Sequence, residues 1–179
     1  MCRWIAATLV VICAGCATVK VQYDSDPNAN FSAFEKFSWI SDFPLIAPEN
    51  DLLIEYRSQP IMSATRDILT RKGYRFVEDR READFVLSFT IGDMGGQLVE
   101  TSYPPEYRGR WYWRGPVFRP GAAVSYAPGQ LRIEVFDAST KAPVWVGYAR
   151  KDITGADQYN ATRLLDDIVT QILRNFPAS

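Results

Sequence analysis

Residues 129–150 constrain the fold more than any other stretch, because they have the pattern of two β-strands joined by a polar turn. Over residues 131–135, apolar side chains alternate with Arg132 and Glu134, which is the two-residue period of a half-buried strand. Asp137-Ala-Ser-Thr-Lys141 then supplies turn residues whose side chains can bond their own backbone. Val144-Trp-Val-Gly-Tyr148 resumes with residues that favour strands. The stretch therefore predicts a β-hairpin, and it carries no obvious catalytic chemistry.

Two other segments have the apolar stripe of a helix that packs against a core. The first covers residues 58–73, with Pro60 in its first turn and Gly73 as the C-cap, and residues 51–57 could add an earlier turn. The second covers residues 159–176, where Pro177 ends it. Its predicted buried face consists of Leu165, Ile168, Val169, Ile172, Leu173 and Phe176.

Shorter apolar runs predict strands at residues 19–23, 36–40, 74–77 and 85–91, with a loop over residues 43–50. Together with the hairpin they predict an α/β (α+β) fold, a two-layer sandwich in which a mixed, mostly antiparallel sheet carries both helices on one face. The other face would present polar side chains to solvent or to a partner. These side chains are Ser88, Thr90, Arg132 and Glu134.

The composition excludes several classes of function. The chain has no histidine, which removes His-based catalytic triads and His-ligated metal sites. Its cysteines are confined to Cys2, Cys13 and Cys16, so the rest of the chain can form neither a disulfide nor a thiolate metal site. The formal net charge of −1 gives no basis for nucleic-acid binding. No cofactor is indicated, and we expect a protein that is not an enzyme.

Residues 1–15 have the features of a secretory signal, with Arg3 followed by an apolar run too short to span a bilayer. The run ends in Cys13-Ala-Gly-Cys16, which resembles the bacterial lipoprotein signal. That resemblance implies that Cys16 is acylated and becomes the mature N-terminus. Ala17 in place of aspartate implies export to the periplasmic face of the outer membrane. The alternative is an ordinary cleaved signal with an incidental cysteine.

Residues 16–179 then form a single α/β domain, and its first strand begins within a few residues of Cys16. An extended tether of this length spans only about 10 Å, so we expect the domain to lie close to the lipid headgroups. The membrane, reached through the lipid anchor, is the first expected partner.

The acidic stretch Asp24–Glu35 has two interpretations. Its oxygen-bearing side chains follow the spacing of a calcium loop, but Ala29 replaces the glycine that such a loop requires and Pro27 stiffens it. The alternative is a turn held by Asx hydrogen bonds after the first strand. Asp24 and Asp26 are also the carboxylates that a hydrolase would use, the least favoured functional class here.

Residues 93–128 form an insertion rich in aromatic and arginine residues between two predicted strands. A connection of this length is uncommon in a compact domain and is often functional. Its candidate partner or ligand surface consists of Arg110, Trp111, Trp113 and Arg114. Interleaved cations and rings can hold glycans, lipid headgroups or a protein partner. The alternative is an extended hairpin whose rings pack locally on the sheet.

Several short motifs occur along the chain in a characteristic order and spacing. They are Val21-x-Tyr-Asp-x-Asp-Pro, Phe31-Ser-x-Phe34, Phe37-Ser-Trp39, Leu69-x-x-Lys-Gly-Tyr74, Ala83-Asp-Phe-Val-Leu-Ser-Phe89, Gly129-x-Leu-x-Ile-x-Val-Phe-Asp137, Val144-Trp-x-Gly147 and Ile172-Leu-x-x-Phe-Pro177. Together these motifs resemble the bacterial lipoprotein family catalogued as domain of unknown function 4136. The resemblance covers nearly the whole mature chain and implies a cell-envelope lipoprotein with an α/β fold and no established activity.

These observations favour a non-enzymatic cell-envelope lipoprotein with a binding or structural role in the periplasm, working with an envelope protein or a glycan. A ligand-binding module that uses the Arg/Trp-rich segment for glycan or lipid headgroups is the alternative.

Overall fold

The computed structural model describes residues 19–47, 54–92, 102–108, 130–151, 157 and 159–179. These residues form one seven-stranded sheet in the order β1-β7-β6-β5-β2-β4, with β3 paired to β5. The strands are β1 (Lys20–Ser25), β2 (Lys36–Trp39), β3 (Leu45–Ile46), β4 (Arg75–Phe76), β5 (Phe85–Ile91), β6 (Gln130–Asp137) and β7 (Pro143–Arg150). The helices are α1 (Ile54–Arg71) and α4 (Ala161–Leu173), and short 3-10 turns are η1 (Phe31–Ala33), η2 (Arg80–Glu82) and η3 (Pro105–Tyr107).

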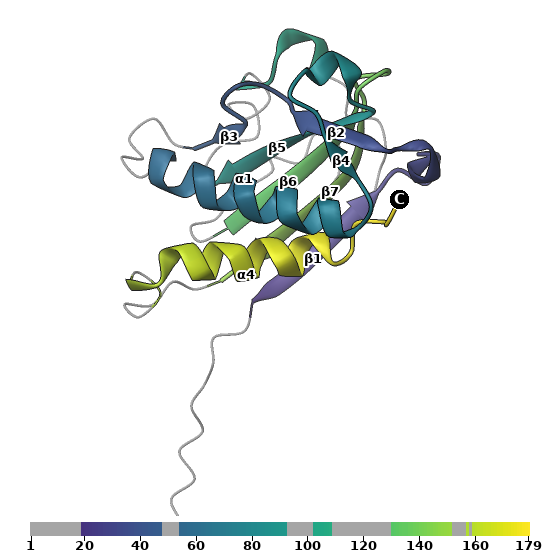
Figure 1. Cartoon of the computed structure of the whole chain (residues 1–179). Coiled ribbons are helices and arrows are strands. Elements are labelled where there is room, and N and C mark those ends of the chain that lie inside the picture. The colour runs from purple at the N-terminus through teal and green to yellow at the C-terminus, as the bar shows by residue number, and fades with distance from the viewer. Residues whose placement is uncertain (1–18, 48–53, 93–101, 109–129, 152–156, 158) are drawn as a thin grey trace, which may run out of the picture.

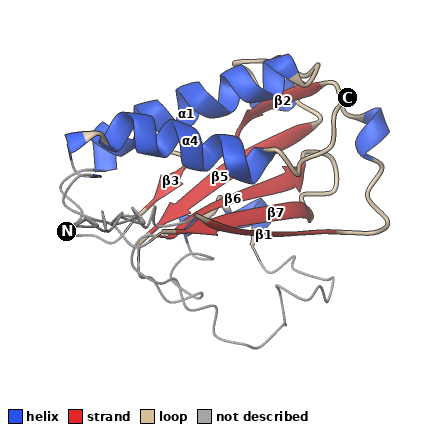
Figure 2. Cartoon of the chain, turned by 90° about the horizontal axis from the view of Figure 1, so that it is seen from below, coloured by secondary structure: helices blue, strands red, loops and turns tan. Residues whose placement is uncertain are grey.

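The two helices lie next to each other on one face of the sheet (Figures 1 and 2). Strands β1, β7, β6 and β5 pair antiparallel, whereas β2 runs parallel to β5 and β4. The predicted two-layer α+β sandwich with a mixed, mostly antiparallel sheet is therefore confirmed.

The predicted hairpin is β6 followed by β7. Its turn is held by Asp137, whose Oδ1 accepts hydrogen bonds from the backbone N–H groups of Ser139 and Thr140, both at 2.8 Å. Lys141 closes the turn with a φ of 61°. Asx bonding within the polar turn thus fixes the register of the two central strands.

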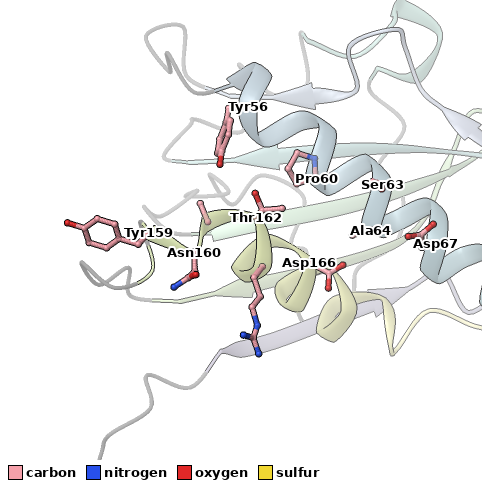
Figure 3. Close-up of a pocket in the computed structure, with 11 residues that line it drawn as sticks. Tyr56, Pro60, Ser63, Ala64, Asp67, Tyr159, Asn160, Thr162 and Asp166 are labelled. Carbon is pink, nitrogen blue, oxygen red and sulfur yellow. The ribbon is translucent and has the colours of Figure 1, made fainter.

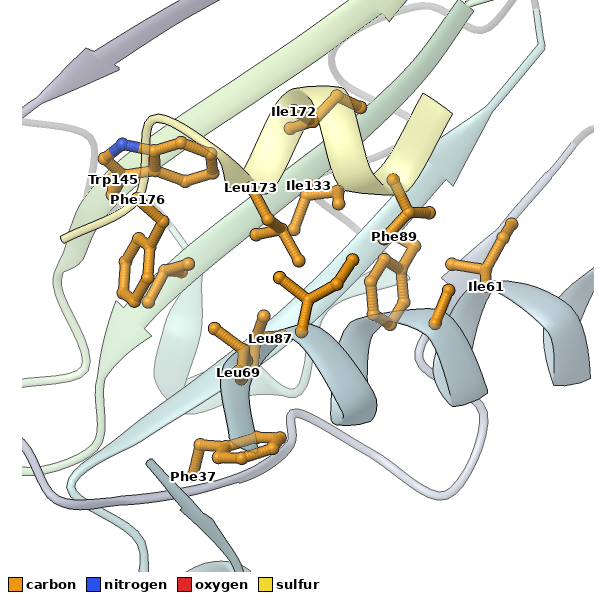
Figure 4. Close-up of a cluster of buried hydrophobic side chains, with 14 of the residues drawn as sticks. Phe37, Ile61, Leu69, Leu87, Phe89, Ile133, Trp145, Ile172, Leu173 and Phe176 are labelled. Carbon is orange, nitrogen blue, oxygen red and sulfur yellow. The ribbon is translucent and has the colours of Figure 1, made fainter. Parts of the chain in front are cut away.

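The main core lies between the sheet and the helices (Figure 4). Alternate residues of β5 and β6 point into it, and the stripe of α4 covers them. Trp145 of β7 is 1% exposed and packs edge-on against Phe176, with ring centroids 5.2 Å apart. The predicted buried face of the second helix is confirmed at all six of its positions.

Two local predictions need correction. The first helix begins at Ile54, in agreement with the earlier turn predicted within residues 51–57, so Pro60 lies inside the helix rather than in its first turn. Proline removes one backbone N–H donor, which an exposed helix face tolerates better than a buried one. The predicted loop over 43–50 contains the short strand β3, because Leu45 and Ile46 pair with β5 and are buried.

The polar face of the sheet was predicted to meet solvent or a partner, and this prediction is wrong. Ser88, Thr90 and Glu134 are fully buried, and Arg132 is 3% exposed. Residues 102–108 contribute to this face, where Tyr103 and Tyr107 both pack edge-on against Phe136. A second, smaller apolar cluster therefore covers part of the sheet on the side away from the helices.

No helix in the described part of the chain combines the length and apolarity needed to cross a bilayer.

Candidate functional site

Glu134 lies at the centre of a buried ionic cluster on the face of the sheet away from the helices. Its Oε1 accepts a hydrogen bond from the Tyr103 hydroxyl at 2.6 Å and lies 2.9 Å from Nε of Arg132. Its Oε2 accepts a hydrogen bond from the Thr90 hydroxyl at 3.3 Å. Arg132 and Glu134 point the same way because they are two residues apart on β6. Opposite charges satisfy each other here without contact with water.

This ionic cluster holds residues 102–108 against the sheet. The Tyr103 hydroxyl makes the bond to Glu134, and within the segment Nε of Arg108 donates to the backbone carbonyl of Tyr103 at 2.8 Å. Nζ of Lys141 lies 5.1 Å from the centre of the Tyr107 ring, and burial raises the pKa of Tyr107 to about 12. Both carboxylate oxygens of Glu134 accept hydrogen bonds, and the residue is fully buried. The geometry therefore suits a structural role in fixing residues 102–108 to the sheet.

An open groove runs between α1 and the start of α4, with a volume of about 570 Å³ (Figure 3). Both helices contribute to its lining, so the groove joins parts of the chain about a hundred residues apart in sequence. Its lining residues are Tyr56, Pro60, Ser63, Ala64, Asp67, Tyr159, Asn160, Ala161, Thr162, Arg163 and Asp166.

Most sequence-predicted site residues fall outside the described part of the chain. Cys16, the predicted lipidation site, lies outside the described residues. So does the whole candidate partner or ligand surface, Arg110, Trp111, Trp113 and Arg114. The neighbouring residues 102–108 have their two tyrosines buried on the sheet, as the alternative interpretation of that insertion expects.

The acidic stretch Asp24–Glu35 forms a turn with Asx hydrogen bonds. Oδ1 of Asp26 accepts from the backbone N–H of Asn28 at 2.9 Å, and Oδ1 of Asn30 accepts from the Ser32 hydroxyl at 2.8 Å. Oδ1 of Asp24 accepts from the backbone N–H of Ser25 at 2.9 Å. Within the described ranges, no three His, Cys, Asp or Glu side chains gather in a group that could hold a metal ion.

Sequence reasoning missed both the ionic cluster and the groove. The alternation on β6 placed Arg132 and Glu134 on one face, but it gave no signal that Tyr103 would cover them. The only local signal for the groove in its lining is one tyrosine near the start of each helix, Tyr56 and Tyr159. Such tyrosines read as ordinary surface residues until the two helices are brought together.

The structure is thus a two-layer α+β domain. It has a buried ionic cluster around Glu134 on one face of the sheet and an open groove between α1 and α4 on the other side. A family model described as "Domain of unknown function (DUF4136)" matches residues 21–178. The chain therefore belongs to the DUF4136 family, as the sequence motifs predicted.

Among solved structures, the chain resembles a DUF4136 family protein from Bacteroides thetaiotaomicron with a TM-score of 0.61 and 20% identity, over 87% of this chain and 94% of that one. A PelC dodecamer from Paraburkholderia phytofirmans gives a TM-score of 0.49 and 14% identity, over 90% of this chain and 99% of that one. A PDZ domain protein from Parabacteroides distasonis gives 0.45 and 15%, over 91% of this chain and 36% of that one. No curated protein matches the chain.

Proposed function

We propose that this protein is a cell-envelope lipoprotein, anchored by acylated Cys16 at the periplasmic face of the outer membrane, with a non-enzymatic binding or structural role. The observation that carries the proposal is the position of β1, the first strand in the described part of the chain. Strand β1 begins at Lys20, four residues after Cys16. Four extended residues span at most about 14 Å, so an acylated Cys16 would hold the sheet next to the lipid headgroups.

The charges at this end of the sheet support a position at a membrane surface. Lys20 and Arg150 are both exposed and lie directly opposite each other in the register of β1 and β7. Like charges placed directly opposite each other destabilise a strand pair, so their placement suggests a compensating contact with anionic groups. Near an anionic membrane surface each basic side chain contributes about 1 kcal/mol of attraction.

The chemistry of the described residues supports a role without catalysis. The most strongly buried ionisable pair, Arg132 and Glu134, is enclosed, and both carboxylate oxygens of Glu134 already accept hydrogen bonds. The 179-residue sequence also lacks histidine, the commonest general acid or base at neutral pH.

Metabolic labelling with radioactive palmitate, followed by membrane fractionation, tests the anchor. The wild type should be labelled and should sediment with the outer membrane, whereas Cys16→Ala should lose the label. Cys2→Ser is the matched control, because it removes a cysteine from the same signal without touching the predicted acylation site. An unlabelled wild type in the soluble fraction would overturn the proposal.

The second candidate function is ligand binding through Arg110, Trp111, Trp113 and Arg114, with glycan or lipid headgroups as ligands. The observation that favours it is the ionic cluster. The hydrogen bond from Tyr103 to Glu134 fixes the chain before residues 109–129, and β6 fixes the chain after them. A segment with both ends fixed loses less conformational entropy when it binds a ligand.

Simultaneous replacement of Arg110, Trp111 and Trp113 by alanine tests this second function. Binding to vesicles of phosphatidylglycerol should fall sharply, while the thermal melting temperature stays that of the wild type. Unchanged vesicle binding by the triple variant, together with unchanged binding to peptidoglycan fragments, would rule this function out.

A further inference from the structure

We propose that the groove between α1 and α4 is a binding site for an oligosaccharide. This inference goes beyond the proposed anchor and does not depend on acylation of Cys16, because every residue it uses lies in the described domain. The α1 wall carries Tyr56, Pro60, Ser63 and Asp67, spaced three or four residues apart on one face of the helix. The opposite wall is the start of α4. A site on two packed helices is preorganised, which lowers the entropic cost of binding.

Exposed aromatic rings gather at this groove. In the described part of the chain, four large hydrophobic side chains are mostly exposed to solvent, and two of these four line the groove. These are Tyr56, 61% exposed, and Tyr159, 91% exposed. Figure 3 shows both at the same end of the groove. The electron-rich face of a tyrosine ring attracts the weakly positive C–H groups that cover one face of a sugar ring. Two such rings therefore offer stacking surfaces for a sugar.

The polar lining can satisfy sugar hydroxyls. It includes the Asp67 and Asp166 carboxylates, the Asn160 amide and the Ser63 hydroxyl. Within the described residues, none of these four side chains makes a hydrogen bond or an ion pair with the protein. Carboxylates accept from hydroxyl groups, and amides both donate and accept. The groove thus supplies hydrogen-bonding groups that the fold itself leaves unused.

The shape and charge of the groove favour an oligosaccharide over other ligands. Asp67 lies eleven residues beyond Tyr56 on α1, which is about 16 Å along the helix axis. A lining of that length suits a chain of several sugar rings better than a compact ligand. Two carboxylates against one guanidinium, Arg163, disfavour phosphates and nucleic acid. The walls are helices without free strand edges, so an extended peptide has no backbone to pair with.

Isothermal titration calorimetry of the purified full chain, with the soluble hexamers of glucose, N-acetylglucosamine and glucosamine as probes, tests the proposal. We expect saturable binding of at least one hexamer. The double variant Tyr56→Ala, Tyr159→Ala should weaken that binding by about tenfold or more, because it removes both stacking surfaces. Asp67→Asn should also weaken it, since a carboxylate makes stronger hydrogen bonds than an amide.

Phe43→Ala is the matched control, because Phe43 is an aromatic residue, 89% exposed, that does not line the groove. Its affinity should equal that of the wild type, and the thermal melts of all variants should coincide because the substituted side chains are on the surface. Absence of binding by all three hexamers up to about 10 mM, or equal affinity of the double variant and the wild type, would overturn the proposal. Capture of a basic peptide in preference to every sugar would overturn it as well.

Discussion

The indole ring of Trp145 lies against Gly147, two residues further along the same strand. A Cβ atom on Gly147 would lie 2.3 Å from Cη2 of Trp145 and 2.6 Å from Cγ2 of Ile172. The sequence motif Val144-Trp-x-Gly147 thus has a physical cause, since only glycine leaves room for the tryptophan ring between strand and helix. Gly147 is needed for space, and its backbone is not in the left-handed region.

We expect Gly147→Ala to destabilise the domain by about 1–3 kcal/mol, because the methyl group forces Trp145 or α4 to move in a close-packed core. Urea unfolding followed by tryptophan fluorescence measures the change. Arg150→Ala on the exposed end of the same strand is the control and should stay within about 0.5 kcal/mol of the wild type. Equal midpoints for Gly147→Ala and wild type would contradict the contact with Trp145.

Replacement of Thr65 by valine should stabilise the protein. The Thr65 side chain on α1 is fully buried, and its hydroxyl has no hydrogen-bond partner within the part of the chain that the structure describes. Valine has nearly the same shape and removes a desolvated polar group, so we expect a gain of about 1 kcal/mol. Thermal unfolding of Thr65→Val and Thr65→Ser distinguishes the outcomes. Serine keeps the hydroxyl and loses a methyl group, so a gain with serine but not with valine would refute this account.

Removal of the Tyr103 hydroxyl should loosen residues 102–108 from the sheet. Tyr103→Phe deletes the hydrogen bond to Glu134, and a bond to a charged group contributes about 1.5–3 kcal/mol. Hydrogen exchange of the 102–108 backbone amides should speed up, with the β6–β7 amides less affected. Tyr107→Phe is the control, because it leaves the bond to Glu134 in place.

Glu134→Gln should cost more than Tyr103→Phe, because it removes the negative charge that lies 2.9 Å from Nε of the buried Arg132. Loss of one member of a buried ion pair typically costs about 3–5 kcal/mol. The double variant Tyr103→Phe, Glu134→Gln should be more stable than the sum of the two single effects predicts. Strict additivity in a denaturant-unfolding cycle would show that the two residues do not act together.

The central hairpin should lose stability in acid through Asp137. Burial raises the pKa of Asp137, but hydrogen bonds from Ser139 and Thr140 outweigh burial and hold the pKa below its usual value of 3.8. A carboxyl whose pKa is lower in the folded state contributes stability above pH 3.8, and that contribution is lost as the pH falls through the folded pKa. Asp137→Asn should therefore flatten the dependence of unfolding free energy on pH below about 4. An unchanged acid slope in the variant would contradict this role for the turn.

The sequence predicted the layers of the fold because local pattern decides them. The alternation of apolar and polar residues on β6 spans only a few residues, and so do the hydrogen bonds of the Asp137 turn. The apolar stripe of α4 likewise repeats within a few helical turns. The buried ionic cluster could not be predicted in this way, since burial of Glu134 depends on Tyr103, which is 31 residues away in sequence. The inter-helix groove likewise depends on how α1 and α4 pack.

Determination of the N-terminus of the mature protein tests most directly whether the protein is a lipoprotein anchored through Cys16. Intact-mass and peptide mass spectrometry of the protein extracted from outer membranes should give a chain that begins at Cys16 and carries added acyl mass on that residue. A chain that begins at Met1, or at any residue other than Cys16, without added acyl mass would contradict the proposed lipoprotein.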